Sequence, residues 1–275
     1  MKLIIGILLS LSLTTLGADP AAPAFKDSRL EENVRKFIFD ANSSKPLTQE
    51  QLSHLYLVSA SNQPIQDLGG LENCPNLNTI YLTGTQVSDL GPLRHLANLE
   101  QVTIVGGQIR DLSPLAGLKH LRYLDLSLNQ ISDLAPLANL KTLQTLNVSS
   151  NAITDLEPLR GLAELQSLYL DGNQVSNLGP IAGLTRLQVL SAKHNRVSDL
   201  KPLISLSSWR TLYLDYNQVS DAAPLVTMVQ PERQPVKGLT PFWVMSLRGN
   251  PLSEQSRLRD VPELQKRTFD LILDP

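Results

Sequence analysis

The chain has almost no cysteine: Cys74 is the single one among 275 residues, so no disulfide can form within the chain. Counting forward from Cys74 in steps of 22 residues leads to Leu96, Leu118 and Leu140. A free cysteine packs like a small hydrophobic side chain. We therefore expect Cys74 to belong to a core rather than to act as a reactive thiol.

Charge is also scarce. Charged residues make up 18% of the chain, the net charge is −2 and the pI is about 6.1. These values argue against a general nucleic-acid binder and against a protein drawn to anionic membranes, because both need a basic surface. No run of like charges indicates a disordered tail.

Motifs of catalysis and metal binding are missing as well. There is no G-x-S-x-G, no glycine-rich phosphate loop and no H-E-x-x-H, and no histidine stands at metal-ligand spacing from the cysteine or another histidine. Aspartates do recur at multiples of 22 residues, and we interpret them as caps of a turn that leads to a proline rather than as calcium ligands. They are Asp89, Asp111, Asp133, Asp155, Asp199 and Asp221. The sequence predicts a protein that is not an enzyme and has no cofactor or metal.

One long apolar run, from Leu3 to Leu13, follows the positively charged start of the chain. Its length suits the core of a secretory signal peptide and is too short for a standard transmembrane helix. We expect a signal peptide at residues 1–18 and an Ala/Pro-rich linker at 19–26, with a retained N-terminal anchor as the alternative. No later segment could span a bilayer, so we expect an exported protein, either periplasmic or secreted.

A 22-residue repeat dominates the rest of the chain. Around Asn129 it reads Leu121-x-x-Leu124-x-Leu126-x-x-Asn129-x-Ile131, which is the pattern L-x-x-L-x-L-x-x-N-x-L of leucine-rich repeats. The asparagine of the pattern recurs, with one insertion before its last copy, as Asn129, Asn151, Asn173, Asn195, Asn217 and Asn250. A proline also falls once per repeat, at Pro92, Pro114, Pro136, Pro158, Pro180, Pro202 and Pro224.

Each position in the repeat predicts a local structure. Leu124 and Leu126 alternate with polar residues, which indicates a short strand with its leucines turned inward. The prolines disfavour a long helix on the return stretch. One coil cannot bury its apolar side alone, so the coils must stack. The sequence predicts an α/β leucine-rich-repeat solenoid: a right-handed horseshoe with a parallel β-sheet on the concave face, a 3₁₀ or extended convex side, and helical caps at both ends.

The organisation follows from the repeat register. We predict a helical N-terminal cap, about nine leucine-rich repeats with an insertion, and a C-terminal cap in which Leu258, Val261 and Leu264 close the last coil. These segments lie at residues 27–54, 55–253 (insertion near 229–241) and 254–275.

The repeat asparagines can bond to buried backbone groups of their own and the neighbouring coil, so we expect them to form a structural ladder. In the first three coils the asparagine is replaced by Gln63, Thr85 and Gly107. We expect that end of the array to be looser.

A candidate binding surface lies on the outward strand positions, which together form one concave sheet. Neighbouring strands lie about 4.8 Å apart, so equivalent positions form columns. Aromatic side chains flanked by charges on a surface of small residues are typical of protein-binding hot spots. The candidate residues are Tyr169, Asp171, Lys193, His194, Tyr213, Asp215 and Tyr216. The alternative is that the charges neutralise one another in a solvated ladder and that the tyrosines satisfy strand propensity.

The motif N-x-I-x-D-L-x-P-L, the helical segment LEENVRKFI and the closing SLRGNPLSEQS resemble bacterial leucine-rich-repeat proteins of the internalin type. The resemblance covers roughly residues 27–275, and the repeat class is shared with the repeat regulatory subunit of protein phosphatase 1. It implies a non-enzymatic bacterial module that binds a protein or peptide on its concave face. Internalins continue into an immunoglobulin-like domain and wall-anchoring elements. The sequence to Pro275 shows neither, so we do not expect an invasion role.

Two other functions are compatible with the sequence. The protein could be a structural scaffold of the cell envelope without a single ligand. It could also be an adaptor similar to the phosphatase regulatory subunit, which requires a cytosolic chain. In each case we expect a monomer and no nucleic-acid partner.

Overall fold

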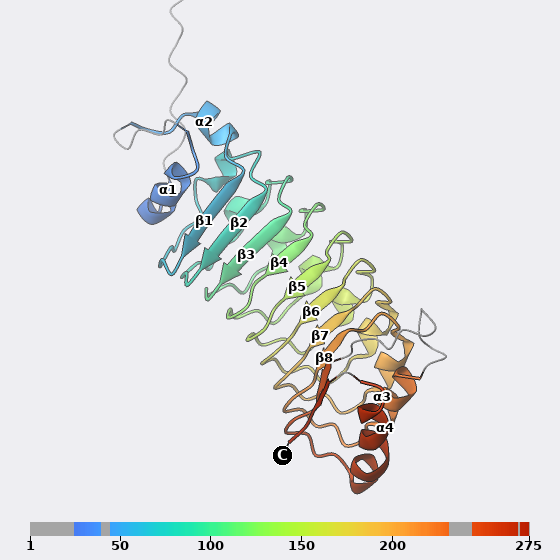
Figure 1. Ribbon diagram of the computed structural model, residues 1–275. Helices are drawn as coiled ribbons and strands as arrows, with labels where there is room; N and C mark the ends of the chain where they lie inside the picture. The colour runs from blue at the N-terminus through green and yellow to red at the C-terminus, as the bar shows by residue number, and fades with distance from the viewer. Residues whose placement is uncertain (1–24, 40–44, 231–243, 269, 275) are drawn as a thin grey trace, which may run out of the picture.

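The computed structural model of the chain describes residues 25–39, 45–230, 244–268 and 270–274. Ten parallel strands form one sheet in chain order (Figure 1). They are β1 (Leu57–Ser61), β2 (Thr79–Thr83), β3 (Gln101–Val105), β4 (Tyr123–Asp125), β5 (Thr145–Asn147), β6 (Ser167–Tyr169), β7 (Val189–Ser191), β8 (Thr211–Tyr213), β9 (Val244–Ser246) and β10 (Asp270–Ile272). The predicted signal peptide and most of the predicted insertion near 229–241 lie outside the described residues.

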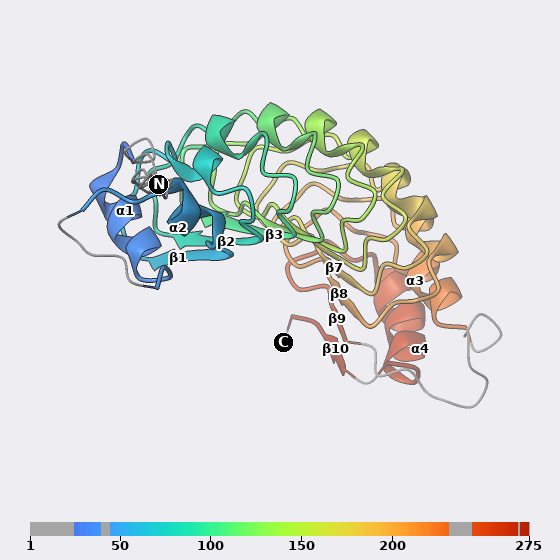
Figure 2. The same cartoon turned by 90° about the horizontal axis from the view of Figure 1, so that it is seen from above.

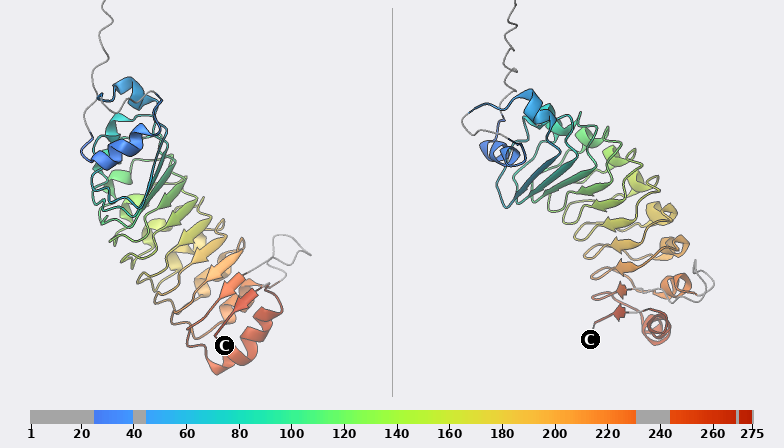
Figure 3. Two further views of the ribbon diagram at one scale, coloured as in Figure 1. Left: turned by 60° about the vertical axis from the view of Figure 1, so that its left-hand side comes forward. Right: turned by 45° about the horizontal axis from the view of Figure 1, so that its top comes forward.

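The coils stack into a curved solenoid whose inner face is the sheet (Figure 2). Short helices occupy the outer face, as both views of Figure 3 show. They are η1 (Leu71–Asn73), η2 (Gly91–Leu93), η3 (Ser113–Leu115), η4 (Ala135–Leu137), η5 (Glu157–Leu159), η6 (Gly179–Gly183), η7 (Lys201–Ser205) and α3 (Ala223–Met228). From η2 onward a proline stands in their first turn, where its fixed φ suits a helix start. The predicted solenoid fold is confirmed.

Leucines of successive coils fill the interior. Leu124 pairs in register with Leu146, and both side chains are fully buried. Leu170 is buried as well, whereas Tyr169 lies on the other side of the sheet. Each leucine buried in this way contributes about 1.5–3 kcal/mol, so stacking of the coils supplies most of the stability. Cys74 lies in the same core, where burial and, to a lesser extent, Glu72 raise the pKa of its thiol to about 12.

The first three strands are longer than the others. β1, β2 and β3 pair with one another over five positions, whereas later strands pair over three. In the later coils, side chains bond to backbone groups of the strands. The side-chain amides of Asn129 and Asn151 donate to the carbonyl oxygen of Leu126, and the backbone N–H of Ser149 donates to the side-chain oxygen of Asn147. The side-chain bonds thus end the strand early. The expectation that the first coils are looser stays a prediction: they lack the asparagine bonds but pair over more strand positions.

Two helices close the N-terminal end. α1 (Ser28–Arg35) begins after Asp27, whose carboxylate accepts the N–H groups of Arg29 and Leu30. α2 (Gln49–Ser53) begins with a capping box between Thr48 and Gln51. α1 packs beside β1 and covers that end of the core with apolar side chains. The predicted helical cap is therefore present over the described residues.

The C-terminal end differs from the prediction. Val261 and Leu264 are buried as expected, but Leu258 is 73% exposed, so its predicted place in the core is wrong. The reason is a π-helical turn at Ser256–Asp260, which leads into α4 (Val261–Gln265) and is wider than an α-helical turn. Ser256 faces inward instead; its hydroxyl accepts the Ala222 N–H and donates to Asp260.

The last strand, β10, was not predicted. It pairs in parallel with β9 and extends the sheet by one strand beyond the ninth repeat. No repeat asparagine marks this strand, so the 22-residue pattern could not reveal it. Over the described ranges, no helix is both long and apolar enough to cross a membrane.

Candidate protein-binding surface

The candidate residues lie on the concave face, over three adjacent coils. Tyr169 ends β6 and Tyr213 ends β8, with Ser191 of β7 between them in the register. Lys193 follows β7, and its ammonium nitrogen lies 4.5 Å from the centre of the Tyr213 ring. A cation–π contact of this kind contributes about 0.5–1 kcal/mol at exposed sites. Lys193 and Tyr213 thus form one preorganised pair.

His194 and Tyr216 form a second pair at the edge of the same surface. Their rings are stacked, with centroids 4.4 Å apart and an interplanar angle of 10°. Both residues have left-handed backbone, with φ of 53° and 57°, a region that usually favours glycine. Neighbouring coils do place glycine here, as Gly172 and Gly249. Tyr216 is 52% exposed, so a strained position carries a solvent-facing ring.

Gly249 occupies the equivalent position in the next coil, and only glycine fits there. Its φ is 64°, and a Cβ would lie 2.3 Å from Cδ1 of Tyr216. The Tyr216 ring therefore lies directly over the backbone of the next coil. The Tyr216 ring is thus flanked by the His194 ring on one side and by Gly249 on the other.

The two candidate aspartates face their neighbours rather than solvent. Asp171 Oδ1 accepts from the hydroxyl of Ser191 at 2.6 Å and from the N–H of Lys193 at 2.8 Å. Asp215, 6% exposed, accepts from the hydroxyl of Ser246 and from the N–H of Arg248. Within the described part of the chain, neither carboxylate forms an ion pair with Lys193.

This arrangement departs from the sequence-based interpretation in one respect. Strand alternation correctly places positions 171 and 215 on the outward side. It does not reveal that their carboxylates fold back onto the backbone of the following coil. Asp171 and Asp215 therefore connect coils, and the groups directed to solvent are Tyr169, Lys193 and Tyr213 together with the stacked pair.

Two tyrosines on the N-terminal half of the concave face were not singled out by the sequence. Tyr81 is 45% exposed and Tyr123 is 37% exposed. Burial raises the pKa of the Tyr123 hydroxyl, and Asp125, Tyr169 and Tyr81 add to this effect. Tyr81 lies in the same column of the sheet as Tyr169, and Tyr123 lies in the neighbouring column.

The repeat asparagines all make the same bonds. Nδ2 of Asn151 donates to the carbonyl oxygens of Leu126, Val148 and Ser149, and its Oδ1 accepts the N–H of Ile131. The same pattern recurs at Asn129, Asn173, Asn195, Asn217 and Asn250. Each amide thus satisfies buried backbone groups of two coils.

The recurring aspartates cap the turns before the outer helices. Asp133 Oδ1, for example, accepts the N–H of Ala135 at 2.8 Å. Equivalent bonds are made by Asp89, Asp111, Asp155, Asp199 and Asp221. Over the described residues, no group of three or more potential metal ligands gathers at one place.

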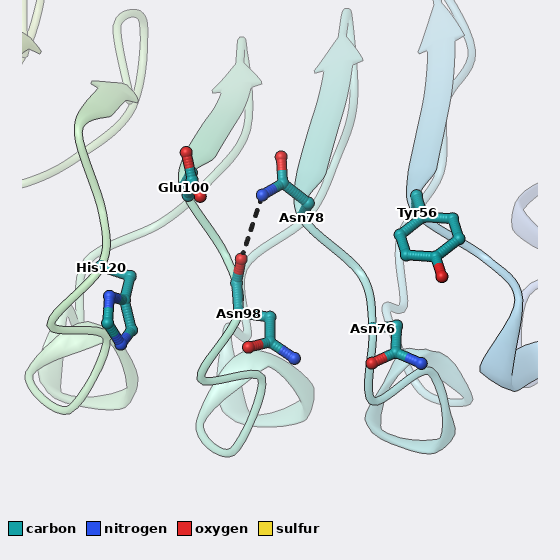
Figure 4. Close-up of a pocket in the computed structure, with 6 residues that line it drawn as sticks. All are labelled: Tyr56, Asn76, Asn78, Asn98, Glu100 and His120. Carbon is teal, nitrogen blue, oxygen red and sulfur yellow. Dashed lines mark hydrogen bonds between the residues drawn. The ribbon is translucent and has the colours of Figure 1, made fainter.

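A polar hollow lies beside the concave face, where the chain leads into β1 to β4 (Figure 4). Its volume is about 290 Å³. The lining residues are Tyr56, Asn76, Asn78, Asn98, Glu100 and His120. None of them was a candidate in the sequence, although all six precede a strand at the same two repeat positions, 56/78/100 and 76/98/120.

The fold and its asparagine ladder define a leucine-rich-repeat protein. The family model described as Leucine Rich repeats (2 copies) matches residues 97–139, 141–183 and 185–226. Among solved structures, internalin C2 from Listeria monocytogenes is 35% identical, with a TM-score of 0.71; the match covers 74% of this chain and 90% of that chain. The chain belongs to the internalin-like family of bacterial leucine-rich-repeat proteins.

Two further structures are similar. An internalin (inlF) from Listeria monocytogenes is 29% identical, with a TM-score of 0.79, over 94% of this chain and 79% of that chain. A leucine-rich-repeat protein from Leptospira interrogans shares the fold at 21% identity, with a TM-score of 0.61, over 82% of this chain and 62% of that chain. No match was found among curated proteins. The fold is typical of protein–protein interaction modules.

Proposed function

We propose that the protein is an exported, non-enzymatic module that binds a protein or peptide partner on its concave face. The contact surface consists of Tyr169, Lys193, His194, Tyr213 and Tyr216. Asp171 and Asp215 hold the backbone beneath this surface and are not part of the contact. The internalin-like fold supports the general role, and the side chains on the concave face support its location.

The observation that carries the proposal is the pair of preorganised contacts on adjacent coils. Lys193 lies over Tyr213, and His194 stacks on Tyr216. Rigid aromatic groups lose little conformational entropy when a partner binds, which favours them as anchors.

Affinity capture from the envelope fraction of the source bacterium tests the proposal. The protein and its Tyr169→Ala/Tyr213→Ala variant serve as bait, and Arg160→Ala on the convex side is the matched control. We expect one or more proteins to be retained by the parent and by the control but lost with the double variant. Retention of the same proteins by all three baits would refute binding on the concave face.

Export has a separate test. We expect the protein from the native cells to lack residues 1–18 and to be found outside the cytosol, and N-terminal mass spectrometry of fractionated cells measures both. An intact Met1 terminus in the cytosolic fraction would contradict export and would favour the adaptor similar to the phosphatase regulatory subunit.

A further inference from the structure

The hollow beside the concave face has an unusual set of hydrogen-bonding groups. One N–H of each outer amide is bonded to the backbone: Nδ2 of Asn76 donates to the carbonyl oxygen of Ser53 at 2.7 Å, and Nδ2 of Asn98 donates to that of Pro75 at 3.0 Å. These bonds fix the orientation of both amides. The amide oxygens of Asn76 and Asn98 are consequently left free, and in Figure 4 both point toward the side where His120 lies.

Glu100 adds a carboxylate to the same hollow. Its Oε2 forms a long ion pair with Nε of Arg122 at 3.8 Å, beyond hydrogen-bond distance, and both side chains are about half exposed, so this pair is weak and open to competition. Over the residues that the structure describes, no hydrogen-bond donor reaches the side-chain oxygens of Asn76, Asn98 or Glu100. The third amide, Asn78, uses its nitrogen on the backbone of Asn98 and its oxygen on Thr79. The hollow therefore offers three side-chain acceptor groups without a hydrogen bond, and one of them is charged.

An aromatic ring borders these acceptors. Tyr56 is 61% exposed and lies at the end of the hollow opposite His120 (Figure 4). The face of an aromatic ring attracts a cation that lies over it, and a carboxylate attracts the same charge. A cation with several donors is complementary to these acceptors.

Three ligand groups can be compared on this basis. A guanidinium has five N–H donors in one plane, carries a positive charge and can stack on an aromatic ring. An ammonium has three donors around a single point and cannot reach acceptors that are spread over two coils as readily. A sugar hydroxyl is neutral, so it gains nothing from the charge of Glu100.

We propose that this hollow binds the guanidinium group of an arginine side chain. It adjoins the concave face, since Gln101 of β3 directly follows Glu100. The proposal rests on the proposed function in that the arginine belongs to a protein partner that docks on the concave face. The hollow then fixes the position of that partner over the first coils.

Amide NMR titration of the protein with N-acetyl-arginine amide tests the site without a partner. We expect saturable shifts at Asn78, Glu100 and His120. Glu100→Gln should lower the affinity about fivefold, a modest factor because the carboxylate is half exposed. N-acetyl-citrulline amide, which has the same shape without the charge, should not bind. Glu32→Gln, the same change at an exposed position of α1, is the control and should leave the affinity unchanged.

Equal binding of arginine and citrulline probes, or shifts confined to other residues, would overturn the proposal. A neutral hexose that perturbs the same amides when the arginine probe does not would also overturn it and would identify a saccharide site. Since the probe is a small molecule, the outcome of the titration does not depend on whether a protein partner is captured. Conversely, a negative titration leaves binding on the concave face standing.

Discussion

At the scale of single residues, the structure depends on side chains that satisfy the backbone of the next coil. Asn151 joins two coils through four hydrogen bonds, and Asp171 and Asp215 do the same from the concave side. A buried backbone group without a partner costs about 1–3 kcal/mol. Polar residues at these positions are therefore as important for stability as the leucines of the core.

The asparagine ladder leads to a measurable difference between two asparagines. Asn151→Ala leaves the N–H of Ile131 without its partner and removes a donor from three carbonyl oxygens, so we expect a loss of about 3 kcal/mol in the free energy of unfolding. Asn139→Ala is the control, because Asn139 is exposed on the convex side. Urea unfolding measures both, and equal losses for the two variants would contradict a structural ladder.

A second residue-scale prediction concerns Gly107, which stands where later coils have asparagine. A Cβ there would lie 2.6 Å from the carbonyl oxygen of Val87 and 2.8 Å from Oδ1 of Asn129. Gly107→Ala should therefore destabilise the protein by about 1–3 kcal/mol through overpacking. Gly117→Ala meets no atom within 4 Å and should be close to neutral. Similar thermal unfolding of both variants would argue against this account.

At the scale of elements, the repeat pattern determined most of the structure but not its exceptions. The inward leucines and the recurrent proline predicted the strands and the outer 3₁₀ helices, because each depends on local periodicity. Leu258 was placed wrongly because a π-helical turn changes the spacing of the helix. The inward bonds of Asp215 depend on the neighbouring coil, so strand alternation alone could not show them.

The N-terminal helix allows a prediction about acid stability. Burial of Asp27 raises the pKa of its carboxyl, but N–H groups of Gln66, Leu30 and Arg29 and the charge of Arg29 outweigh this and lower it. A carboxyl whose pKa is lower in the folded state stabilises the fold above its unfolded value of about 3.9, and this stability is lost as the pH falls through the folded value.

Asp27→Asn should therefore lower the free energy of unfolding by about 1 kcal/mol at pH 7. The difference from the parent should shrink as the pH falls below about 4, where the aspartate of the unfolded chain begins to take up a proton. Urea unfolding at pH 7 and pH 3 measures this, with Glu32→Gln as the exposed control. A difference that is the same at both pH values would count against the charge of Asp27 as the stabilising factor.

At the scale of the whole molecule, each coil contacts mainly its neighbours, and the caps cover the ends of the core. The sequence predicted the concave sheet and the tyrosines on it, since both follow from the repeat register. It could not predict the stacked His194–Tyr216 pair, because that contact depends on left-handed backbone in two successive coils. The polar hollow was also hidden, because its residues come from four different coils.

The central claim is that a partner is held by the aromatic residues of the C-terminal coils. Titration calorimetry with the captured partner tests it most directly, by comparing Tyr169→Ala/Tyr213→Ala with Tyr81→Ala. We predict that the double variant loses about 2 kcal/mol or more of binding free energy, because truncated aromatic anchors dominate such interfaces. Tyr81→Ala should have a smaller effect, and the melting temperatures should barely change. Unchanged affinity in the double variant together with lost binding in Tyr81→Ala would contradict the account and place the site on the N-terminal coils.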